Sequence, residues 1–396
     1  MIIDLSACQN CLKGIAVESS ISRGRLYLET EAGTRSAYQR DRDRIVHSSA
    51  FRRLKYKTQV FVYHEGDNYR TRLSHSLEVS QIARSISRFL GLNEDLAEAL
   101  ALAHDLGHTC FGHAGEDALK ACMKNYNGFD HNAQALRIVT KLERRYPTFD
   151  GLNLTWEMLE GLVKHNGPLL DANLTPKIPL AIQEYVVEHD LELDKHASAE
   201  AQVAAVADDI AYNAHDIDDG LTANLFSLHS LKAVPLIGPI VVSVEEEFPD
   251  LNEGRQTHEI VRRLIGHMVN DVIIRSANNY QRLVPNSQQD VHVLGEPVVC
   301  FSKEMKNNDK ALKDFLFANM YRHDRVLRMT DEAKRVVRDL FGLLHNDPSH
   351  LPEDWQVNMD GPRGLRTARR VADYIAGMTY RFALKEHTRF FGPLVI

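Results

Sequence analysis

Apolar residues recur at intervals of three and four along almost the whole chain, and this spacing is the feature that most constrains the fold. Residues 75–90 show it well. Six apolar side chains from Val79 to Leu90 share one helical face there, and Gly91, a common helix-ending residue, follows. Alternation with a period of two, which marks a half-buried strand, is nearly absent. The sequence therefore predicts an all-α fold.

Helix-start signals support this prediction. Asn93 can cap a helix that carries Glu94 and Asp95 in its first turn, where acidic groups complement the helix dipole. This helix runs through LAEALALA to His104 and Asp105 at its C-terminal end. Further helices are expected at 40–60, 132–144, 155–165, 178–188, 199–224, 256–282, 309–320, 330–345 and 364–385.

The chain of 396 residues, 44% of them hydrophobic, is long enough for one large domain or two closely packed ones. We expect an N-terminal segment (1–34), a core (35–225) and a C-terminal helical region (226–396) that packs on the core. The stretch 286–300, with NSQQD and LGEP, is the best candidate for a surface loop between a catalytic body and the C-terminal helices.

No segment of the sequence predicts a membrane span or a secretory leader. The longest apolar run, VPLIGPIVVSV at 234–244, is short and interrupted by proline and glycine, and no apolar leader region follows MIIDLSACQNCLKG. The five cysteines lack the spacing of a disulfide framework, and Cys8 and Cys11 have no two further zinc ligands near them. We therefore expect a cytoplasmic protein with reduced, free thiols.

Charge is distributed unevenly along the chain. The net charge of −7 argues against a surface built entirely for nucleic acid. Residues 35–57, however, contain eight arginines and lysines against two aspartates. This basic segment suits either a polyanionic ligand or a solvated helix face.

Residues 104–116, HDLGHTCFGHAGE, concentrate groups that titrate or bind metal. His104 and Asp105 stand at one helix end and His75 at the start of the preceding helix, so two antiparallel helices would bring the three together. Imidazole nitrogens and carboxylate oxygens suit a borderline or hard divalent ion. Three such residues can coincide by chance in a chain with 19 histidines, so a fourth ligand is needed.

The helix expected at 199–224 supplies a candidate for that fourth ligand. Asp208 stands nearly opposite an apolar stripe that runs from Val203 to Leu221. This helix contains no lysine or arginine, although five aspartates crowd into residues 208–219, and like charges at that density repel unless a cation neutralises them. We infer that Asp208 or a near neighbour meets a bound cation; the alternative is a solvated acidic face.

Nine segments, in order, resemble the HD superfamily of metal-dependent phosphohydrolases. The closer similarity is to the bacterial deoxynucleoside triphosphate triphosphohydrolases of the deoxyguanosinetriphosphate triphosphohydrolase-like group. It covers nearly the whole chain and implies a helical HD core with additional C-terminal helices. The segments are SRGRLY, RDRIVHSSAFRRLKYKTQVF, RTRLSHSLEVSQIAR, AHDLGHTCFGHAGE, FDHNAQALRI, LTWEMLEGLVKHNGP, ADDIAYNAHDIDDGL, FLFANMYRH and VADYIAGMT.

The resemblance implies a role for each matching residue. It implies that a divalent ion (Mn, Mg, Fe, Ni or Zn) is bound by His75, His104, Asp105 and Asp208, the last in preference to Asp209. It implies that the catalytic pair is His113 and Glu116, with His131 beside them. It further implies that the phosphates are contacted by Arg72, His108, His131 and Lys164, and that the deoxyribose is recognised by Gln59, Tyr212 and Asp216.

Two segments depart from the family pattern. The usual HDLGHPPFGH is HDLGHTCFGH here, which changes Thr109 and Cys110 but keeps every ionisable group. The usual acidic residue after AGMT is Tyr380, so any role of that position in the family is in doubt for this chain.

The family reaction is attack at the α-phosphorus of a deoxynucleoside triphosphate, which gives deoxynucleoside and tripolyphosphate. A divalent ion on two imidazoles and two carboxylates can activate a water molecule for such a step. Other HD activities, such as those of a nucleotidase or phosphodiesterase, would use the same ligands, and a nucleotide-regulated nucleic-acid-binding protein is a further alternative. The resemblance also implies a homo-oligomer, a tetramer or hexamer, and weak single-stranded nucleic-acid binding.

Overall fold

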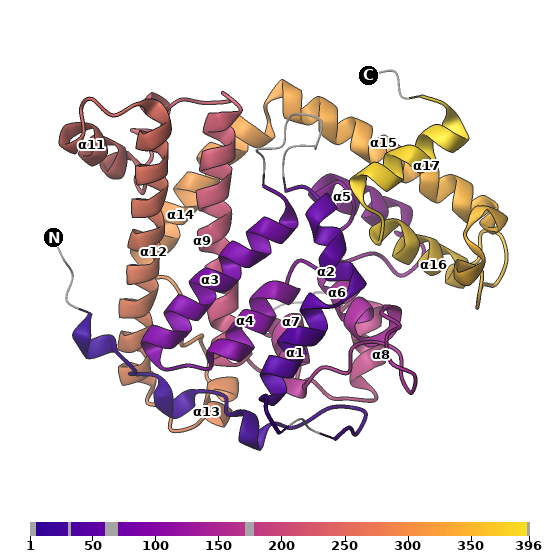
Figure 1. Cartoon of the computed structure of the whole chain (residues 1–396), viewed down its shortest axis with the longest axis horizontal. Coiled ribbons are helices and arrows are strands. Elements are labelled where there is room, and N and C mark those ends of the chain that lie inside the picture. Colours follow the sequence, from indigo (N-terminus) through magenta and orange to yellow (C-terminus); the bar gives the residue numbers. More distant parts are fainter. Residues whose placement is uncertain (1–4, 31–32, 60–69, 171–177, 394–396) are drawn as a thin grey trace.

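The computed structural model of the protein describes residues 5–30, 33–59, 70–170 and 178–393. Within these ranges the chain is helical and forms no β-strand, only isolated bridges such as the one between Arg25 and Thr155. The all-α prediction is therefore confirmed (Figure 1). No helix in the described ranges combines the length and the apolar character needed to cross a membrane.

The helices of the first half of the chain are α1 (Ala37–Val46), α2 (Ser49–Arg53), α3 (Arg72–Leu90), α4 (Glu94–Ala103), α5 (Gly112–Cys122), α6 (His131–Arg137), α7 (Trp156–Lys164), α8 (Leu180–Val186) and α9 (Ala199–Thr222). Those of the second half are α10 (Leu228–Leu231), α11 (Gly238–Glu247), α12 (Glu253–Leu283), α13 (Gln288–Val293), α14 (Lys303–Leu316), α15 (Asp324–Asn346), α16 (Leu365–Ala376) and α17 (Tyr380–Phe391).

Shorter helical turns join these elements. Two of them are π-helical, η6 (Ile138–Leu142) directly after α6 and η7 (Phe317–Tyr321) directly after α14. The 3-10 turns include η1 (Ser6–Cys8), η2 (Lys13–Ile15), η3 (Ser19–Ile21), η4 (Leu54–Tyr56), η8 (Pro348–His350) and η9 (Glu353–Trp355).

The larger core forms around α3, which packs against both α4 and α9. The sharp connection between α3 and α4 follows the sequence signals: Gly91 has a left-handed φ of 82°, and the Asn93 side chain accepts a hydrogen bond from the backbone N–H of Leu96. Helix α12 lies along the other side of α9. Three helices that carry predicted ligands are thus held in one buried layer.

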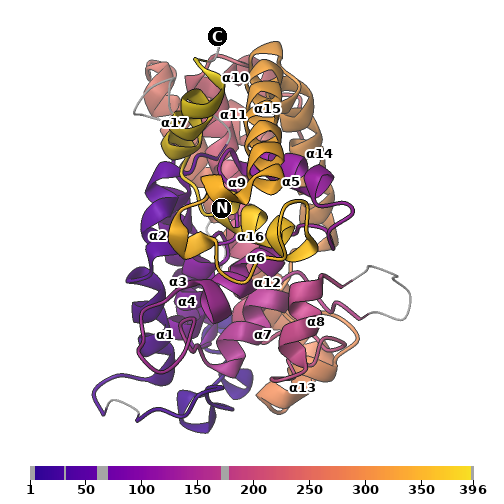
Figure 2. The same cartoon turned by 90° about the vertical axis from the view of Figure 1, so that its right-hand side faces the viewer.

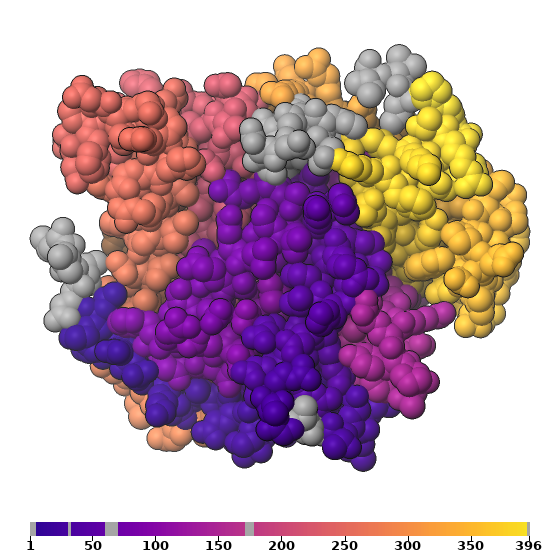
Figure 3. Space-filling view, viewed as in Figure 1, coloured from indigo at the N-terminus to yellow at the C-terminus, as the bar shows by residue number. Residues whose placement is uncertain are grey.

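A second apolar cluster joins α5 to the C-terminal helices. Leu119 of α5 is buried together with Val337 and Phe341 of α15 and Val371 of α16. Figure 2 shows α15 and α17 in the upper part of the molecule, α16 near its middle, and α7 and α8 below it. In the space-filling view the first half of the chain fills the centre of the face, between α11–α12 and the C-terminal helices (Figure 3). The C-terminal region therefore supports the helix that follows residues 104–111.

Four local predictions need correction. The helix expected at 40–60 is two helices, α1 and α2, because the chain breaks after Val46 and the Ser48 side chain caps α2. The helix expected at 364–385 is two helices, because the chain breaks at Gly377 and Thr379 then caps α17. The stretch 286–300 is not a plain surface loop: it contains α13, and Val298 and Val299 are buried in the main core. Helices α5 and α11 were not expected.

The basic segment 35–57 is largely committed to contacts within the protein. Arg44 is buried, and its guanidinium donates to the carbonyl oxygen of Leu152. Lys57 is buried as well, and its ammonium donates to the carbonyl oxygens of His108 and Ala376. Such contacts support the fold, and they leave fewer arginine and lysine side chains of this segment available to a polyanionic ligand.

Gly107 permits a close contact that positions the loop after α4. A Cβ on this residue would lie 1.9 Å from the carbonyl oxygen of His131 and 2.5 Å from the backbone nitrogen of Ala135, both in α6. We therefore expect Gly107→Ala to lower the free energy of unfolding by about 3 kcal/mol, measured by urea denaturation. Gly266→Ala in α12 is the control, since a Cβ there meets nothing within 4 Å and stability should be equal or higher. An unchanged stability of Gly107→Ala would contradict this contact.

Candidate active site

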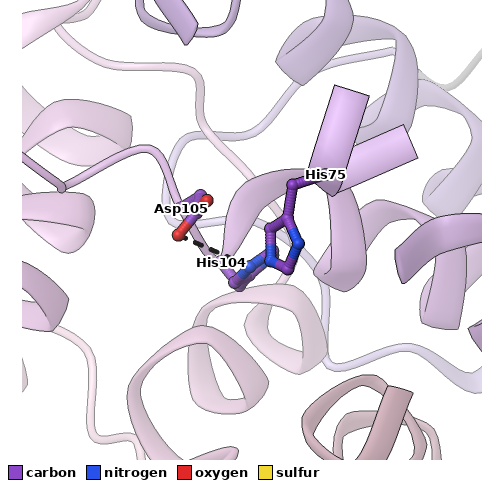
Figure 4. Close-up of side chains that lie close together, drawn as sticks. All are labelled: His75, His104 and Asp105. Carbon is purple, nitrogen blue, oxygen red and sulfur yellow. Dashed lines mark ion pairs between the residues drawn. The ribbon is translucent and has the colours of Figure 1, made fainter. Parts of the chain in front are cut away.

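The four residues predicted as metal ligands converge from three helices. His75 lies near the start of α3, His104 and Asp105 directly follow α4, and Asp208 lies midway along α9. His75 Nε2 is 2.8 Å from Asp208 Oδ1, and His104 Nε2 is 3.4 Å from the same oxygen and 3.5 Å from Asp105 Oδ1. Figure 4 shows the side chains of His75, His104 and Asp105 gathered at one point. We call these four residues the ligand cluster.

The donor atoms of the ligand cluster fit a divalent ion. Nε2 of His104 and Oδ2 of Asp105 are buried, and neither has a hydrogen-bond partner among the described residues. His104 Nδ1 is 2.6 Å from the carbonyl oxygen of Ala101. A carbonyl oxygen only accepts, so Nδ1 carries a proton, and Nε2 presents a lone pair to the cluster once it gives up its own proton to solvent on metal binding. Two imidazoles and two carboxylates are a common donor set for borderline divalent metals.

The electrostatics of the cluster favour a cation. Burial raises the pKa of the Asp105 carboxyl, but the Arg72 guanidinium and His104 beside it outweigh burial and hold the pKa well below its usual range. Burial lowers the pKa of His104, but Asp105 and Asp208 overcome this and raise it to about 9. The two carboxylates therefore remain ionised and draw positive charge to the point between them.

Arg72 and His108 both contact the ligand cluster through Asp105. The Arg72 guanidinium donates to Asp105 Oδ1 at 2.8 Å, and His108 Nδ1 is 3.0 Å from the same oxygen. Burial, with the charge of Arg72, lowers the pKa of His108 to about 3, so this imidazole is neutral near pH 7. The pair between Arg72 and Asp105 was not predicted from sequence.

A second group lies beside the ligand cluster, on α5 and at the start of α6. Its centre is Glu116, whose carboxylate is 2.9 Å from His131 Nδ1, 3.6 Å from His113 Nδ1 and 2.9 Å from Lys120 Nζ. Burial raises the pKa of Glu116, but hydrogen bonds from His113, His131 and Lys120 outweigh it and hold the carboxyl ionised. The ring centroids of His108 and His131 are 4.4 Å apart, so this second group, which we call the histidine group, adjoins the ligand cluster.

A third group lies on the same side of α9 as Asp208. Tyr212 and Asp216 follow Asp208 at successive four-residue steps, and the hydroxyl of Tyr321 hydrogen-bonds to both of them. Burial raises the pKa of the Asp216 carboxyl to about 7. Tyr212 and Tyr321 line a pocket together with Gln59, His113 and part of α15. The pocket therefore connects the Tyr212 side of α9 to the histidine group.

Sequence reasoning missed Tyr321. It lies in the quoted segment FLFANMYRH but 105 residues after Asp216, and it is presented by η7, a π-helical turn. Such turns shift the helical register and are frequent at functional sites. No periodicity in the sequence predicts this shift.

Lys164 is not brought to the ligand cluster. Its side chain is fully buried, and its ammonium lies 3.1 Å from Glu160 Oε2 and donates to the carbonyl oxygen of Glu192. The next residue, His165, interacts electrostatically with His104 and Asp208 instead. These contacts do not support the predicted phosphate contact of Lys164, which stays a prediction. Lys164 and His165 have different surroundings because successive residues of a helical turn point about 100° apart.

Tyr380, which replaces the family's usual acidic residue, packs under the loop after α4. It is buried, and its ring contacts that of Phe111 edge to face, with 4.9 Å between ring centroids. Phe111 has a left-handed φ of 65° and precedes α5. An aromatic side chain at this position supports the loop through apolar contact.

Known proteins are similar to this chain over nearly its whole length. Residues 72–213 match the model of the HD domain and residues 299–389 that of the phosphohydrolase-associated domain. The deoxyguanosinetriphosphate triphosphohydrolase-like protein of Parvibaculum lavamentivorans is 60% identical over 377 residues, 95% of each chain. Proteins of the same description from Azorhizobium caulinodans and Mesorhizobium japonicum are 59% and 56% identical, over 93% and 95% of this chain and 94% of each relative.

Proposed function

Because the chain belongs to the family of deoxyguanosinetriphosphate triphosphohydrolase-like proteins and is an HD-domain phosphohydrolase, we propose that it hydrolyses deoxynucleoside triphosphates to deoxynucleoside and tripolyphosphate. The observation that carries this proposal is the adjacency of three groups: the ligand cluster, the Glu116 histidine group and the Tyr212 pocket. Together they offer a place for a metal, a proton-transfer group and a place for a sugar.

The proposed ligands are His75, His104, Asp105 and Asp208. A divalent ion held there would polarise a phosphate oxygen and lower the pKa of a water molecule. Asp105 is held in place by Nη1 of Arg72, while Nη2 of the same guanidinium lies near Gly112 and suits a phosphate of the substrate.

The histidine group would move the proton that the reaction requires. Glu116 is ionised and buried, so it can orient His113 and His131 and stabilise either one when it is protonated. The side chain of His113 is 61% exposed, which leaves its ring accessible to a substrate. In this proposal His113 delivers a proton to the leaving 5′-oxygen of the sugar or takes one from water.

The product distinguishes this proposal from other HD activities. Purified protein with each deoxynucleoside triphosphate and Mn²⁺ or Mg²⁺, with and without a second one, should release deoxynucleoside and tripolyphosphate, resolved by anion-exchange chromatography. In water enriched in ¹⁸O the label should enter tripolyphosphate, because attack at the α-phosphorus breaks its bond to the 5′-oxygen. Release of orthophosphate or pyrophosphate would instead favour a nucleotidase or phosphodiesterase.

Two expectations remain predictions that rest on the resemblance alone. They are assembly into tetramers or hexamers and weak binding of single-stranded nucleic acid. The contacts that Arg44 and Lys57 make inside the fold weaken the alternative of a protein that mainly binds nucleic acid through residues 35–57.

A further inference from the structure

The far side of the His75 ring faces a histidine that the proposed chemistry does not use. His75 Nδ1 is 3.0 Å from Nδ1 of His215 in α9. The other nitrogen of His215, Nε2, pairs with Oε2 of Glu78 in α3. The side chains of His75 and His215 are 2% and 5% exposed, so water has little access to the contact between them.

We propose that His215 and Glu78 are positioning residues that fix the tautomer and orientation of His75 and thereby strengthen metal binding. The inference rests on the metal site of the proposed function but not on the substrate. We call Glu78, His215 and His75 the relay.

The positions of the protons follow from the donors and acceptors of the relay. A carboxylate only accepts, so His215 Nε2 carries a proton and donates it to Glu78. In neutral His215 the Nδ1 atom is then an acceptor, and His75 Nδ1 must donate to it. This leaves the lone pair on His75 Nε2, the nitrogen that faces the ligand cluster.

The relay also bears on the contact between His75 and Asp208. His75 Nε2 is 2.8 Å from Asp208 Oδ1, a distance at which a protonated Nε2 donates a hydrogen bond. With the proton on Nδ1 instead, the Nε2 lone pair faces that carboxylate oxygen. A lone pair and a carboxylate oxygen repel each other unless a cation lies between them. The relay therefore sets His75 in the state that binds metal.

The backbone makes this arrangement rigid. Glu78 follows His75 by three residues on α3, and His215 follows Asp208 by seven residues on α9, so each pair shares one helical face. Arg70 supports Glu78 at 3.5 Å and donates to Asp218 at 2.7 Å. The same two helices thus supply two metal ligands and the residues that orient one of them.

The test measures metal affinity, which an ordinary structural role would not change. The variants are His215→Leu, which removes both polar atoms, His215→Gln, whose amide can accept from His75 and donate to Glu78, and Glu78→Gln. Mn²⁺ affinity is measured by isothermal titration calorimetry. Outer-shell changes of this kind cost about 10- to 100-fold in metal affinity. We expect a loss in that range for His215→Leu, a smaller loss for His215→Gln and about tenfold for Glu78→Gln.

Two matched controls distinguish a loss of metal affinity caused by the relay from one caused by a general loss of stability. His387→Leu removes another buried histidine that pairs with a carboxylate, Asp339 at 2.9 Å, and Glu94→Gln neutralises a carboxylate paired with Arg88 on the surface. Both should bind Mn²⁺ as the parent does, even where the melting temperature of His387→Leu falls.

The outcomes are distinguishable. A parent protein that binds no divalent ion would refute the metal site and with it the proposed function. A parent that binds Mn²⁺, with folded His215→Leu and Glu78→Gln variants that bind equally well, would overturn the relay alone. If His215→Leu fails to fold, His215→Gln and Glu78→Gln decide, and unchanged affinity in both overturns the relay.

Discussion

His104→Ala is expected to abolish turnover and metal binding together, with little effect on folding. The side chain supplies one of the four proposed ligands, and its other nitrogen, Nδ1, hydrogen-bonds to the carbonyl oxygen of Ala101. Loss of a ligand that costs several kcal/mol of transition-state stabilisation lowers turnover by about 1,000-fold or more. Metal content by mass spectrometry after dialysis, turnover and melting temperature check this result.

Asp105→Ala should give the same losses and also destabilise the fold. Asp105 is the partner of both the buried Arg72 guanidinium and His108, so its removal leaves a buried charge without compensation. Breaking a buried ion pair from one side costs about 3–5 kcal/mol. The contrast between the two variants separates metal binding from folding.

His229→Ala, on the exposed surface of α10, is the control for both variants and should retain metal and activity. A His104→Ala or Asp105→Ala protein with normal metal content and full turnover would refute the ligand assignment.

The helical layer and the proximity of His75 and His104 could be predicted from the sequence because both depend on short-range signals. Periodic apolar residues define α3, α4 and α9, and Gly91 and Asn93 fix the turn between the first two. Once α3 and α4 are antiparallel neighbours, His75 and His104 meet. The proximity of Asp208 needed a charge argument and the resemblance, since α9 is distant in sequence.

Contacts between distant segments could not be predicted in the same way. Tyr321 reaches Asp216 through a π-helical turn, and His215 reaches His75 because α9 crosses α3 at one particular rotation. Lys164 and His165 are adjacent in sequence, yet Lys164 contacts the carbonyl oxygen of Glu192 whereas His165 interacts with His104 and Asp208. In each case the tertiary packing of the helices, rather than local propensity, decides which side chains meet. The roles of these residues remain predictions.

The protein should prefer deoxyribose to ribose, and Tyr212, Asp216 and Tyr321 should carry that preference. Tyr212 and Tyr321 line the pocket, and the Tyr321 hydroxyl hydrogen-bonds to both Tyr212 and the buried Asp216, so the three form one connected polar group. Such a group can hydrogen-bond a 3′-hydroxyl, and the ring of Tyr212 packed against C2′ would leave little room for a 2′-hydroxyl. Sites of this kind discriminate by clash and by unpaired polar atoms.

Tyr185→Phe is the matched control for Tyr212→Phe, since Tyr185 of α8 is also buried and its hydroxyl contacts His189, which does not line the pocket. It should leave the turnover of dGTP and its ratio to GTP unchanged. A purely structural role of Tyr212, packing α9 against η7, would make Tyr212→Phe behave like this control.

Tyr212→Phe and Asp216→Asn should lower turnover of dGTP by about 10- to 100-fold, as expected for lost hydrogen bonds of 1.5–3 kcal/mol to a charged or strongly polar group, while metal content stays normal. Tyr321→Phe should impair turnover as well, because it releases both Tyr212 and Asp216 from their shared hydroxyl. Comparison of dGTP with GTP in the parent and the three variants tests the assignment. Equal hydrolysis of dGTP and GTP by the parent, or intact dGTP turnover in Tyr212→Phe and Asp216→Asn, would show that this polar group does not recognise the sugar.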